Sequence, residues 1–317
     1  MKTWLDYAAF GLAALLPLAS VQAAAQPDRL TPSDAEVIVQ VNVRQMLQTP
    51  LAKKHALDPL KALLERSTET SRLLPVAGLD PFKDIDTIAL STSGRPLSGG
   101  KLLVVVRGSF TPDKVLAAAD DYSKKHPDRV KNCKEGDLPM WEIHSDDKSF
   151  YAAFADNKTL VMTATKKDTA AVVHRAGQPP QQLSAAMQAA LAHLKGDENM
   201  WLAMVATEDI KQLLRSEDTS KGFADALQSV TGALELSEDA QFRLVAHTDS
   251  AEAAAKIKAK LEELMPLLSF LGAGKDKSGQ IAKEVIDSIQ LKAEKNDVSV
   301  RIHVTEAQIQ QAHKKDR

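Results

Sequence analysis

The sequence predicts an α+β protein built from two tandem units of ferredoxin-like order, with antiparallel sheets and helices packed on one face, preceded by a cleavable signal peptide. Three observations predict this architecture. Residues 85–125 read as a strand, a Gly-rich turn, a second strand and a capped helix. The same order returns in residues 229–264. A strand and a helix also precede each copy, so each unit reads strand-helix-strand-strand-helix, followed by more strands.

The first copy carries the clearest local signals. Residues 94–100 hold turn-forming glycines and a proline between two apolar segments, which predicts a hairpin. The second of these segments, residues 102–106, is apolar at every position and suits a strand that is buried on both faces. Thr111 and Pro112 then predict a helix start, because Thr111 can cap backbone N–H groups and proline is tolerated at the first helical position.

The second copy repeats this pattern with different residues. Residues 230–236 and 241–247 read as strands, and Asp249 and Glu252 have the spacing of a reciprocal capping box before a helix over residues 253–264. The elements expected before the two copies are strands over residues 36–43 and 200–206 and helices over residues 44–66 and 208–228.

The remaining elements extend both units. Four short strands form a meander in the first unit, and a hairpin closes the second; they are predicted over residues 130–134, 140–144, 150–154, 159–163, 288–294 and 298–304. Helices are expected over residues 168–175 and 184–195. Thr305 and Gln308 predict a capped C-terminal helix. The Gln- and Pro-rich residues 178–182 mark the boundary between a first domain, 26–178, and a second, 183–317.

The first 25 residues have the pattern of a secretory signal peptide. Lys2 precedes a mostly apolar run that ends in small residues, with candidate cleavage after Ala23 or after Ala25. The apolar run is shorter than the roughly 20 residues that span a bilayer, so we favour cleavage over a membrane anchor. The mature chain is therefore expected in the periplasm or outside the cell, and no later run is long enough for a transmembrane helix.

Composition argues against a nucleic-acid partner, an extended ring-stacking surface and an internal disulfide. The net charge of −2 argues against a nucleic-acid partner, which would require a basic face. Aromatic residues make up 4% of the chain, too few for an extended ring-stacking surface. A single cysteine, Cys133, excludes an internal disulfide, and its thiol is either buried, free or paired with another chain.

The most apolar helical segment is a candidate partner-binding surface. Pro266 is expected to kink or break a helix there. The residues that could form an exposed apolar patch for an unknown protein or envelope partner are Leu264, Leu267, Leu268, Phe270 and Leu271. The alternative is a helix buried between the sheet and the domain interface. Residues 272–279 are expected to form a loop.

No catalytic, cofactor-binding or metal-ligating motif emerges from the sequence. The histidines show no pair at the spacing that would place two imidazoles on one helix face. His144 lies near Asp146 and Asp147, but a solvated hairpin turn explains this group better than a metal site does. Cys133 has no surrounding nucleophile signature, and no phosphate-binding loop precedes a helix. We expect no cofactor.

Three segments resemble landmarks of uncharacterised exported bacterial proteins that carry a duplicated α+β domain of unknown function. The segments are residues 34–43, 78–86 and 156–161, and the similarity covers most of the mature chain. In the second segment, Leu79-Asp80-Pro81 looks like the turn that delivers the chain into the hairpin. The resemblance implies a duplicated secreted fold, and it carries over no functional residue.

Two classes of function remain open. The first is a non-enzymatic envelope or periplasmic protein that binds a macromolecule or serves as a structural module. The alternative is a secreted hydrolase whose site lies between the domains and is not visible in sequence. Buried titratable groups gathered in one groove would favour the hydrolase, whereas an exposed apolar face would favour the binding protein.

Overall fold

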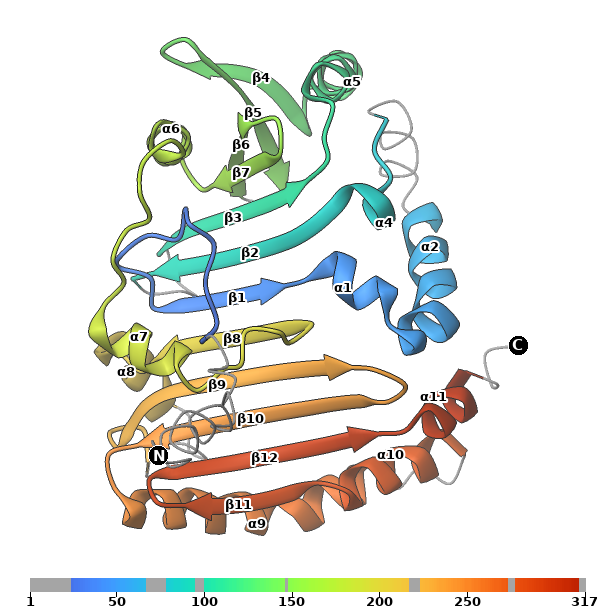
Figure 1. The fold of residues 1–317 in the computed structure, drawn as a ribbon, viewed down its shortest axis with the longest axis vertical. Helices are drawn as coiled ribbons and strands as arrows, with labels where there is room; N and C mark the ends of the chain where they lie inside the picture. The colour runs from blue at the N-terminus through green and yellow to red at the C-terminus, as the bar shows by residue number, and fades with distance from the viewer. Residues whose placement is uncertain are drawn as a thin grey trace, which may run out of the picture.

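The computed structural model describes residues 24–66, 78–94, 100–145, 148–216, 223–272 and 277–313. Its strands form one twelve-stranded antiparallel sheet (Figure 1). The strands are β1 (Val37–Val41), β2 (Ile85–Ser93), β3 (Lys101–Gly108), β4 (Val130–Glu135), β5 (Leu138–Ser145), β6 (Lys148–Asp156), β7 (Thr159–Thr163), β8 (Met200–Val205), β9 (Leu227–Leu236), β10 (Ala240–Thr248), β11 (Gln290–Glu294) and β12 (Asp297–Val304). The α+β class and the antiparallel pairing are confirmed.

Helices connect and flank these strands. They are α1 (Val43–Gln48), the π-helix η1 (Ala52–Ala56), α2 (Leu57–Arg66), α4 (Pro81–Asp84), α5 (Pro112–Lys125), α6 (Lys166–Arg175), α7 (Ala185–Leu191), α8 (Glu208–Ser216), α9 (Ala251–Gly272), α10 (Lys277–Asp287) and α11 (Glu306–His313). In the part of the chain that the structure describes, no helix has the length and apolar character needed to cross a membrane.

The strand order differs from the predicted ferredoxin-like arrangement. From edge to edge the order is β11-β12-β10-β9-β8-β1-β2-β3-β7-β6-β5-β4. A split βαβ unit would carry the chain across the sheet into a parallel strand. Here β1 pairs with β2, and β8 with β9, in antiparallel fashion. The helical connection keeps the chain at the end of the sheet where the preceding strand ended. The next strand therefore runs in the opposite direction and pairs beside it.

The two predicted domains share this sheet. β1 and β8 pair in its middle, with Val39 opposite Leu202, and the backbone ladder therefore runs from one segment into the other. In both segments the third strand pairs with the last, as β3 does with β7 and β10 with β12.

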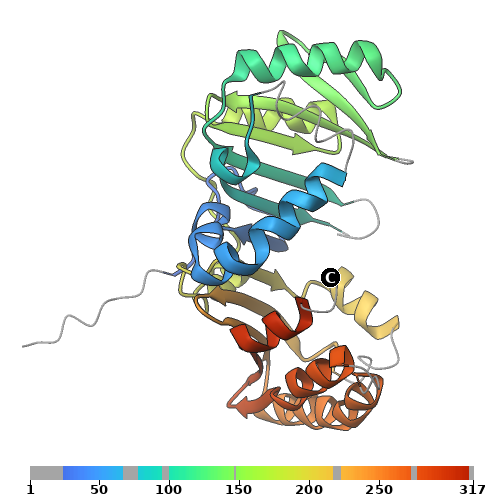
Figure 2. The same ribbon diagram turned by 90° about the vertical axis from the view of Figure 1, so that its right-hand side faces the viewer.

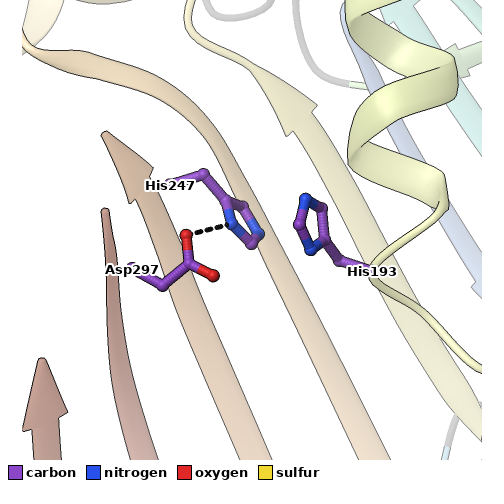
Figure 3. Close-up of side chains that lie close together, drawn as sticks. All are labelled: His193, His247 and Asp297. Atoms are coloured by element: carbon purple, nitrogen blue, oxygen red, sulfur yellow. Dashed lines mark hydrogen bonds and ion pairs between the residues drawn. The ribbon is translucent and has the colours of Figure 1, made fainter. Parts of the chain in front are cut away.

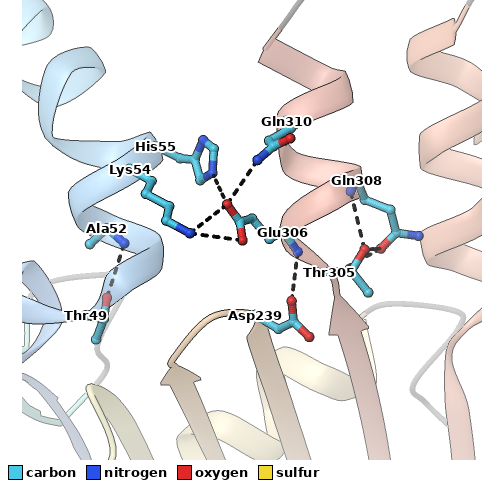
Figure 4. Close-up of polar contacts among 9 residues, drawn as sticks. All are labelled: Thr49, Ala52, Lys54, His55, Asp239, Thr305, Glu306, Gln308 and Gln310. Carbon is cyan, nitrogen blue, oxygen red and sulfur yellow. Dashed lines mark hydrogen bonds and ion pairs between the residues drawn. The ribbon is translucent and has the colours of Figure 1, made fainter.

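Polar contacts also join the two segments beside this ladder. Glu306, at the start of α11, accepts hydrogen bonds from the Lys54 ammonium at 3.2 Å and pairs with the His55 imidazole at 3.2 Å (Figure 4). The backbone N–H of Glu306 donates to the carboxylate of Asp239 at 2.8 Å. The backbone N–H of Leu51 donates to the carbonyl of Ser237 at 3.0 Å. We call the contacts of Lys54 and His55 with Glu306 the η1–α11 latch.

Helices pack on both faces of the sheet, in contrast to the predicted single face (Figure 2). Residues paired across strands share a face. On one face, helix α6 packs against Val105 and Val161, and α7 packs against Trp201. On the other face, α9 packs against Val298, and Asp120 of α5 accepts a hydrogen bond from Asn132. We call these the α6/α7 face and the α5/α9 face.

Several predicted boundaries need correction. Helix α9 continues through Pro266 to Gly272, because a proline removes a single N–H donor and the rest of the helix is retained. The predicted loop over residues 272–279 is shortened by α10, which begins at Lys277. The helix expected over residues 208–228 ends at Ser216, and β9 begins at Leu227.

Candidate functional site

The central strands expose apolar side chains on the α5/α9 face. Three cross-strand rows run over β8, β1, β2, β3 and β7, and pairing places their members directly beside one another. These rows are interrupted only by Thr92. The apolar members, all partly exposed, are Met200, Leu202, Met204, Val37, Val39, Val41, Ile88, Leu90, Leu102, Val104, Val106, Leu160 and Met162. We call this set the apolar strip.

The opposite face of the same strands is closed. Ile38 and Val161 are 0% exposed there, under a cover formed by α6, α7 and residues 24–35. The run over residues 102–106 predicts a strand buried on both faces, and the structure buries one face: Leu103 and Val105 are buried, whereas Val104 is partly exposed. These strands thus carry apolar residues on both faces, and the described helices bury only one of the two faces.

Leaving such a surface in water has a cost that a partner could remove. Burying each CH₂ group is worth about 0.8 kcal/mol, so completing the burial of several partly exposed Val, Leu and Met side chains provides a substantial driving force for association. Contiguous apolar surface on a folded protein typically marks an interaction site.

A cavity lies where β1 leaves the sheet. Its volume is about 430 Å³, and Leu47, Leu57 and Phe82 contribute apolar lining. Lys61 and Lys83 add positive charge at its edge. The cavity thus combines apolar and cationic groups near the end of the strip formed by Val41 and Ile88.

A separate cluster of titratable groups lies on the α6/α7 face (Figure 3). The Nδ1 atom of His247 is 2.9 Å from a carboxylate oxygen of Asp297, and its Nε2 atom is 3.1 Å from the Thr231 hydroxyl. The His193 ring stacks on His247 with ring centroids 3.9 Å apart. These residues are distant in sequence. The pairing of β10 with β9 and β12 brings Thr231 and Asp297 to His247, and the turn that follows α7 brings His193.

This hydroxyl, imidazole and carboxylate have the connectivity of a nucleophile, a base and an orienting group. Thr231 is, however, only 1% exposed, so its hydroxyl cannot meet a substrate. Burial lowers the pKa of His247, an effect that the Asp297 carboxylate opposes. The arrangement therefore acts as a buried hydrogen-bonded support for the sheet.

The same cluster contains three groups that could bind a metal ion. His193, His247 and Asp297 place one ligand atom each within 4.8 Å of one another. A ligand lone pair lies in the plane of its imidazole, so two stacked rings do not aim their lone pairs at one point. Both nitrogens of His247 are also already hydrogen-bonded. A metal ion would have to separate the rings and break one of these bonds.

Of the five residues predicted to bind a partner, only Leu264 has a side chain in the described part of the structure. Leu264 is partly exposed on α9. The side chains of Leu267, Leu268, Phe270 and Leu271 lie outside the described part of the structure, and the patch that they would form stays a prediction.

The other sequence candidates have ordinary surroundings. Cys133 is partly buried, and burial raises the pKa of its thiol, which disfavours the reactive thiolate. The Nδ1 atom of His144 is 3.0 Å from the Ser149 hydroxyl. Asp146 and Asp147 lie outside the described residues.

Sequence reasoning missed the apolar strip and the histidine cluster. A signal for the strip exists in retrospect, because β1, β3 and β8 carry apolar residues at most alternate positions as well as at the covered ones. No local signal identifies the histidine cluster.

No protein-family model matches this chain, and neither a curated protein nor a solved structure does. The resemblance drawn from residues 34–43, 78–86 and 156–161 therefore stays an expectation.

Proposed function

We propose that this chain is an exported, non-enzymatic protein of the bacterial envelope or periplasm that binds another protein through the apolar strip. The observation that carries the proposal is the partial exposure of three apolar rows on strands whose other face is packed beneath α6, α7 and residues 24–35. A binding protein needs such an accessible surface, whereas a purely structural protein gains nothing from leaving it in water.

The dimensions of the strip favour a polypeptide partner. Five strands spaced about 4.8 Å apart span about 19 Å between the outer two, and an α-helix with its side chains is about 10–12 Å wide. An amphipathic helix of a partner would therefore fit along or across the rows, with its apolar side on the strip. Small molecules are more often enclosed in pockets that bury most of their surface.

The alternative function, a secreted hydrolase, has one supporting observation. Thr231, His247 and Asp297 are hydrogen-bonded in the order that nucleophilic catalysis uses. The burial of Thr231 weighs against it, since a nucleophile must reach the scissile bond. We therefore retain the binding function.

Export and internal duplication are also part of the proposal. The pattern of residues 1–25 supports export, and the recurring pairings of β3 with β7 and β10 with β12 support a duplicated unit. Ala25 is 4% exposed and packs in the core with Trp201. We therefore place the cut after Ala23, which leaves Ala25 in the mature chain.

Charged substitutions on the strip test the binding function. Val39→Asp and Val104→Asp place a carboxylate on partly exposed positions, so the chain should still fold and show an unchanged circular dichroism spectrum. Binding of a fluorescent apolar dye to the purified protein should fall several-fold in both variants. Ala185→Asp is the matched control, because it introduces the same carboxylate at an exposed position outside the strip, in the first turn of α7, where an acidic side chain is tolerated.

Photo-crosslinking identifies the partner directly. A photoreactive amino acid at Leu90 should give one defined protein adduct in the native envelope, and the same amino acid at the exposed Lys292 on β11 should not. Unchanged dye binding in both strip variants, together with no adduct at Leu90, would refute the proposal.

A further inference from the structure

In the described part of the chain, no helix lies over the α6/α7 face of strands β10, β12 and β11 (Figure 1). Alternate residues of these strands point to that face, and most are polar and exposed, in contrast to the closed apolar core under α6 and α7. The exposed residues are Gln241, Gln290, Lys292, Glu294, Arg301 and His303, whereas Val245 and His247 on β10 are buried. This surface lies on the opposite side of the sheet from the apolar strip.

A cavity of about 390 Å³ opens on this face. Its polar lining consists of Lys195, Glu235, Gln241, Arg243, Ser288, Gln290, Arg301 and His303. Ala233 and Ile302 add apolar lining. The volume falls within the range of about 300–1,000 Å³ that small-molecule sites occupy.

Two arginines face each other across this cavity. Arg243 on β10 and Arg301 on β12 are direct cross-strand partners, so their Cβ atoms lie about 4.5–5.5 Å apart. Like charges at directly opposed positions destabilise a sheet. The protein thus keeps two guanidinium groups side by side where a neutral residue would be more stable.

Glu198 forms a long ion pair with Arg243 and leaves Arg301 without a carboxylate partner among the described residues. Glu198 is 1% exposed, and its oxygens accept the backbone N–H groups of Lys195 at 2.9 Å and Gly196 at 2.7 Å. Nη2 of Arg243 is 3.7 Å from Glu198, too far for a hydrogen bond, and this buried nitrogen has no acceptor among the described residues.

Other charges around the cavity are already paired. The Lys195 ammonium contacts Glu235 at 2.8 Å, and His303 contacts Asp239 at 2.9 Å. Within the described part of the chain, no carboxylate pairs with Arg301. The cavity therefore holds guanidinium donors that lack an acceptor.

We propose that this cavity binds a phosphate group, with Arg243 and Arg301 as its ligands. Guanidinium groups present paired N–H donors that match the oxygens of phosphate. A doubly charged phosphate also removes the repulsion between the two arginines, which a monoanionic carboxylate offsets only in part. Since the cavity is larger than a bare phosphate, the group belongs to an organic phosphate whose body fills the rest of the cavity.

The source of the phosphate is either a soluble phosphate ester or a phospholipid headgroup. Titration calorimetry of the full chain in buffer without phosphate or sulfate distinguishes them. The first arm uses inorganic phosphate and glycerol 3-phosphate, and the second uses acetate. The third uses vesicles that contain phosphatidic acid, whose headgroup is likewise a phosphate monoester. We expect glycerol 3-phosphate to bind in the soluble case and only the vesicles to bind in the lipid case.

The variant Arg301→Gln tests the assigned ligand. It should weaken the binding of phosphate by about tenfold or more, because a charge-assisted hydrogen bond to a guanidinium is lost. It should also raise the thermal unfolding midpoint of the free protein, because the opposed charges are removed. Lys292→Gln makes the same change of charge at an exposed position on the same face outside the cavity, and it should alter neither property.

Three results would overturn the assignment: no binding in any phosphate arm, equal binding by Arg301→Gln and the wild type, or acetate binding as tightly as the phosphate probes. The rise in unfolding midpoint is a second readout that does not require a ligand, and a fall in the midpoint of Arg301→Gln would contradict the repulsion on which the proposal depends.

Discussion

The side chain of His247 on β10 forms hydrogen bonds to the two neighbouring strands, β9 and β12. It is 6% exposed, and both ring nitrogens are hydrogen-bonded, one to Asp297 and one to Thr231. Burial favours the neutral imidazole and lowers the pKa of His247 in the folded protein. In the unfolded chain the ring has an ordinary pKa of about 6.5.

This difference makes stability depend on pH. Between the lowered pKa and about 6.5, the unfolded chain binds a proton at His247 and the folded chain does not, so stability rises with pH across that window. We expect the urea midpoint of the wild type to fall as the pH decreases from 7 to 5. His247→Gln should fold with a different midpoint and a flatter dependence on pH.

The control for this prediction is His174→Gln, which removes an exposed imidazole from α6. Its pH dependence should match that of the wild type. If His247→Gln keeps the slope of the wild type, the buried imidazole does not control the acid sensitivity of the fold.

Residues such as these could not be located from sequence. Arg243 and Arg301 are opposed only because β10 and β12 pair in one register, and a shift of one residue would send them to opposite faces. His247 meets Asp297 through the same register, and His193 reaches it from the turn that follows α7. Local patterns carry no information about such register, so neither cluster was predicted.

At the scale of elements, helix starts could be predicted from sequence where local hydrogen bonding determines the structure. The reciprocal capping box predicted at Thr305 is present: the Thr305 backbone N–H donates to the Gln308 side chain at 2.9 Å, and the Gln308 N–H donates to the Thr305 hydroxyl at 3.3 Å. Thr111 is the N-cap of α5 as predicted, but its side chain makes no capping hydrogen bond.

The box predicted from Asp249 and Glu252 is wrong. The Ser250 hydroxyl caps α9 by accepting from the N–H of Ala253 at 3.3 Å, and Glu252 instead pairs with Lys256 at 2.7 Å. The physical reason is competition: an adjacent hydroxyl reaches the free N–H, and an ammonium one turn along the helix attracts the carboxylate. Sequence spacing alone does not rank these partners.

The two threonine caps give a matched pair of substitutions. Thr305→Ala removes a formed hydrogen bond and should lower the free energy of unfolding by about 1 kcal/mol. Thr111→Ala removes no capping bond and should change it by less than about 0.5 kcal/mol. Urea unfolding of both variants measures the difference, and equal losses would show that the capping geometry does not decide the contribution.

At the scale of the whole molecule, strand identities were predictable and their arrangement was not. Each predicted strand has its counterpart in the sheet. The pairing of β1 with β8, in contrast, joins two strands whose first residues, Val37 and Met200, are 163 positions apart in the sequence. That pairing creates the continuous sheet, and the sheet in turn creates the apolar strip. The strip combines residues from both halves and belongs to neither alone.

The η1–α11 latch ties these halves together beside the central ladder. The His55 imidazole and the Lys54 ammonium hold the pKa of Glu306 below its ordinary value. A carboxylate with a lowered folded pKa contributes stability above its unfolded pKa of about 4.3, and this contribution is lost as the pH falls through the lowered folded value. The latch is therefore formed at neutral pH and weakens in acid.

We expect Glu306→Gln to speed amide hydrogen exchange in η1 and in α11 by about two- to fivefold at pH 7, because it removes an exposed ion pair of modest strength. Glu252→Gln is the control: it removes a pair with Lys256 that lies within α9, and it should affect that helix alone. Exchange measured by mass spectrometry resolves the segments. Faster exchange confined to α11, with η1 unchanged, would mean that Glu306 stabilises its own helix and does not connect the two halves of the sheet.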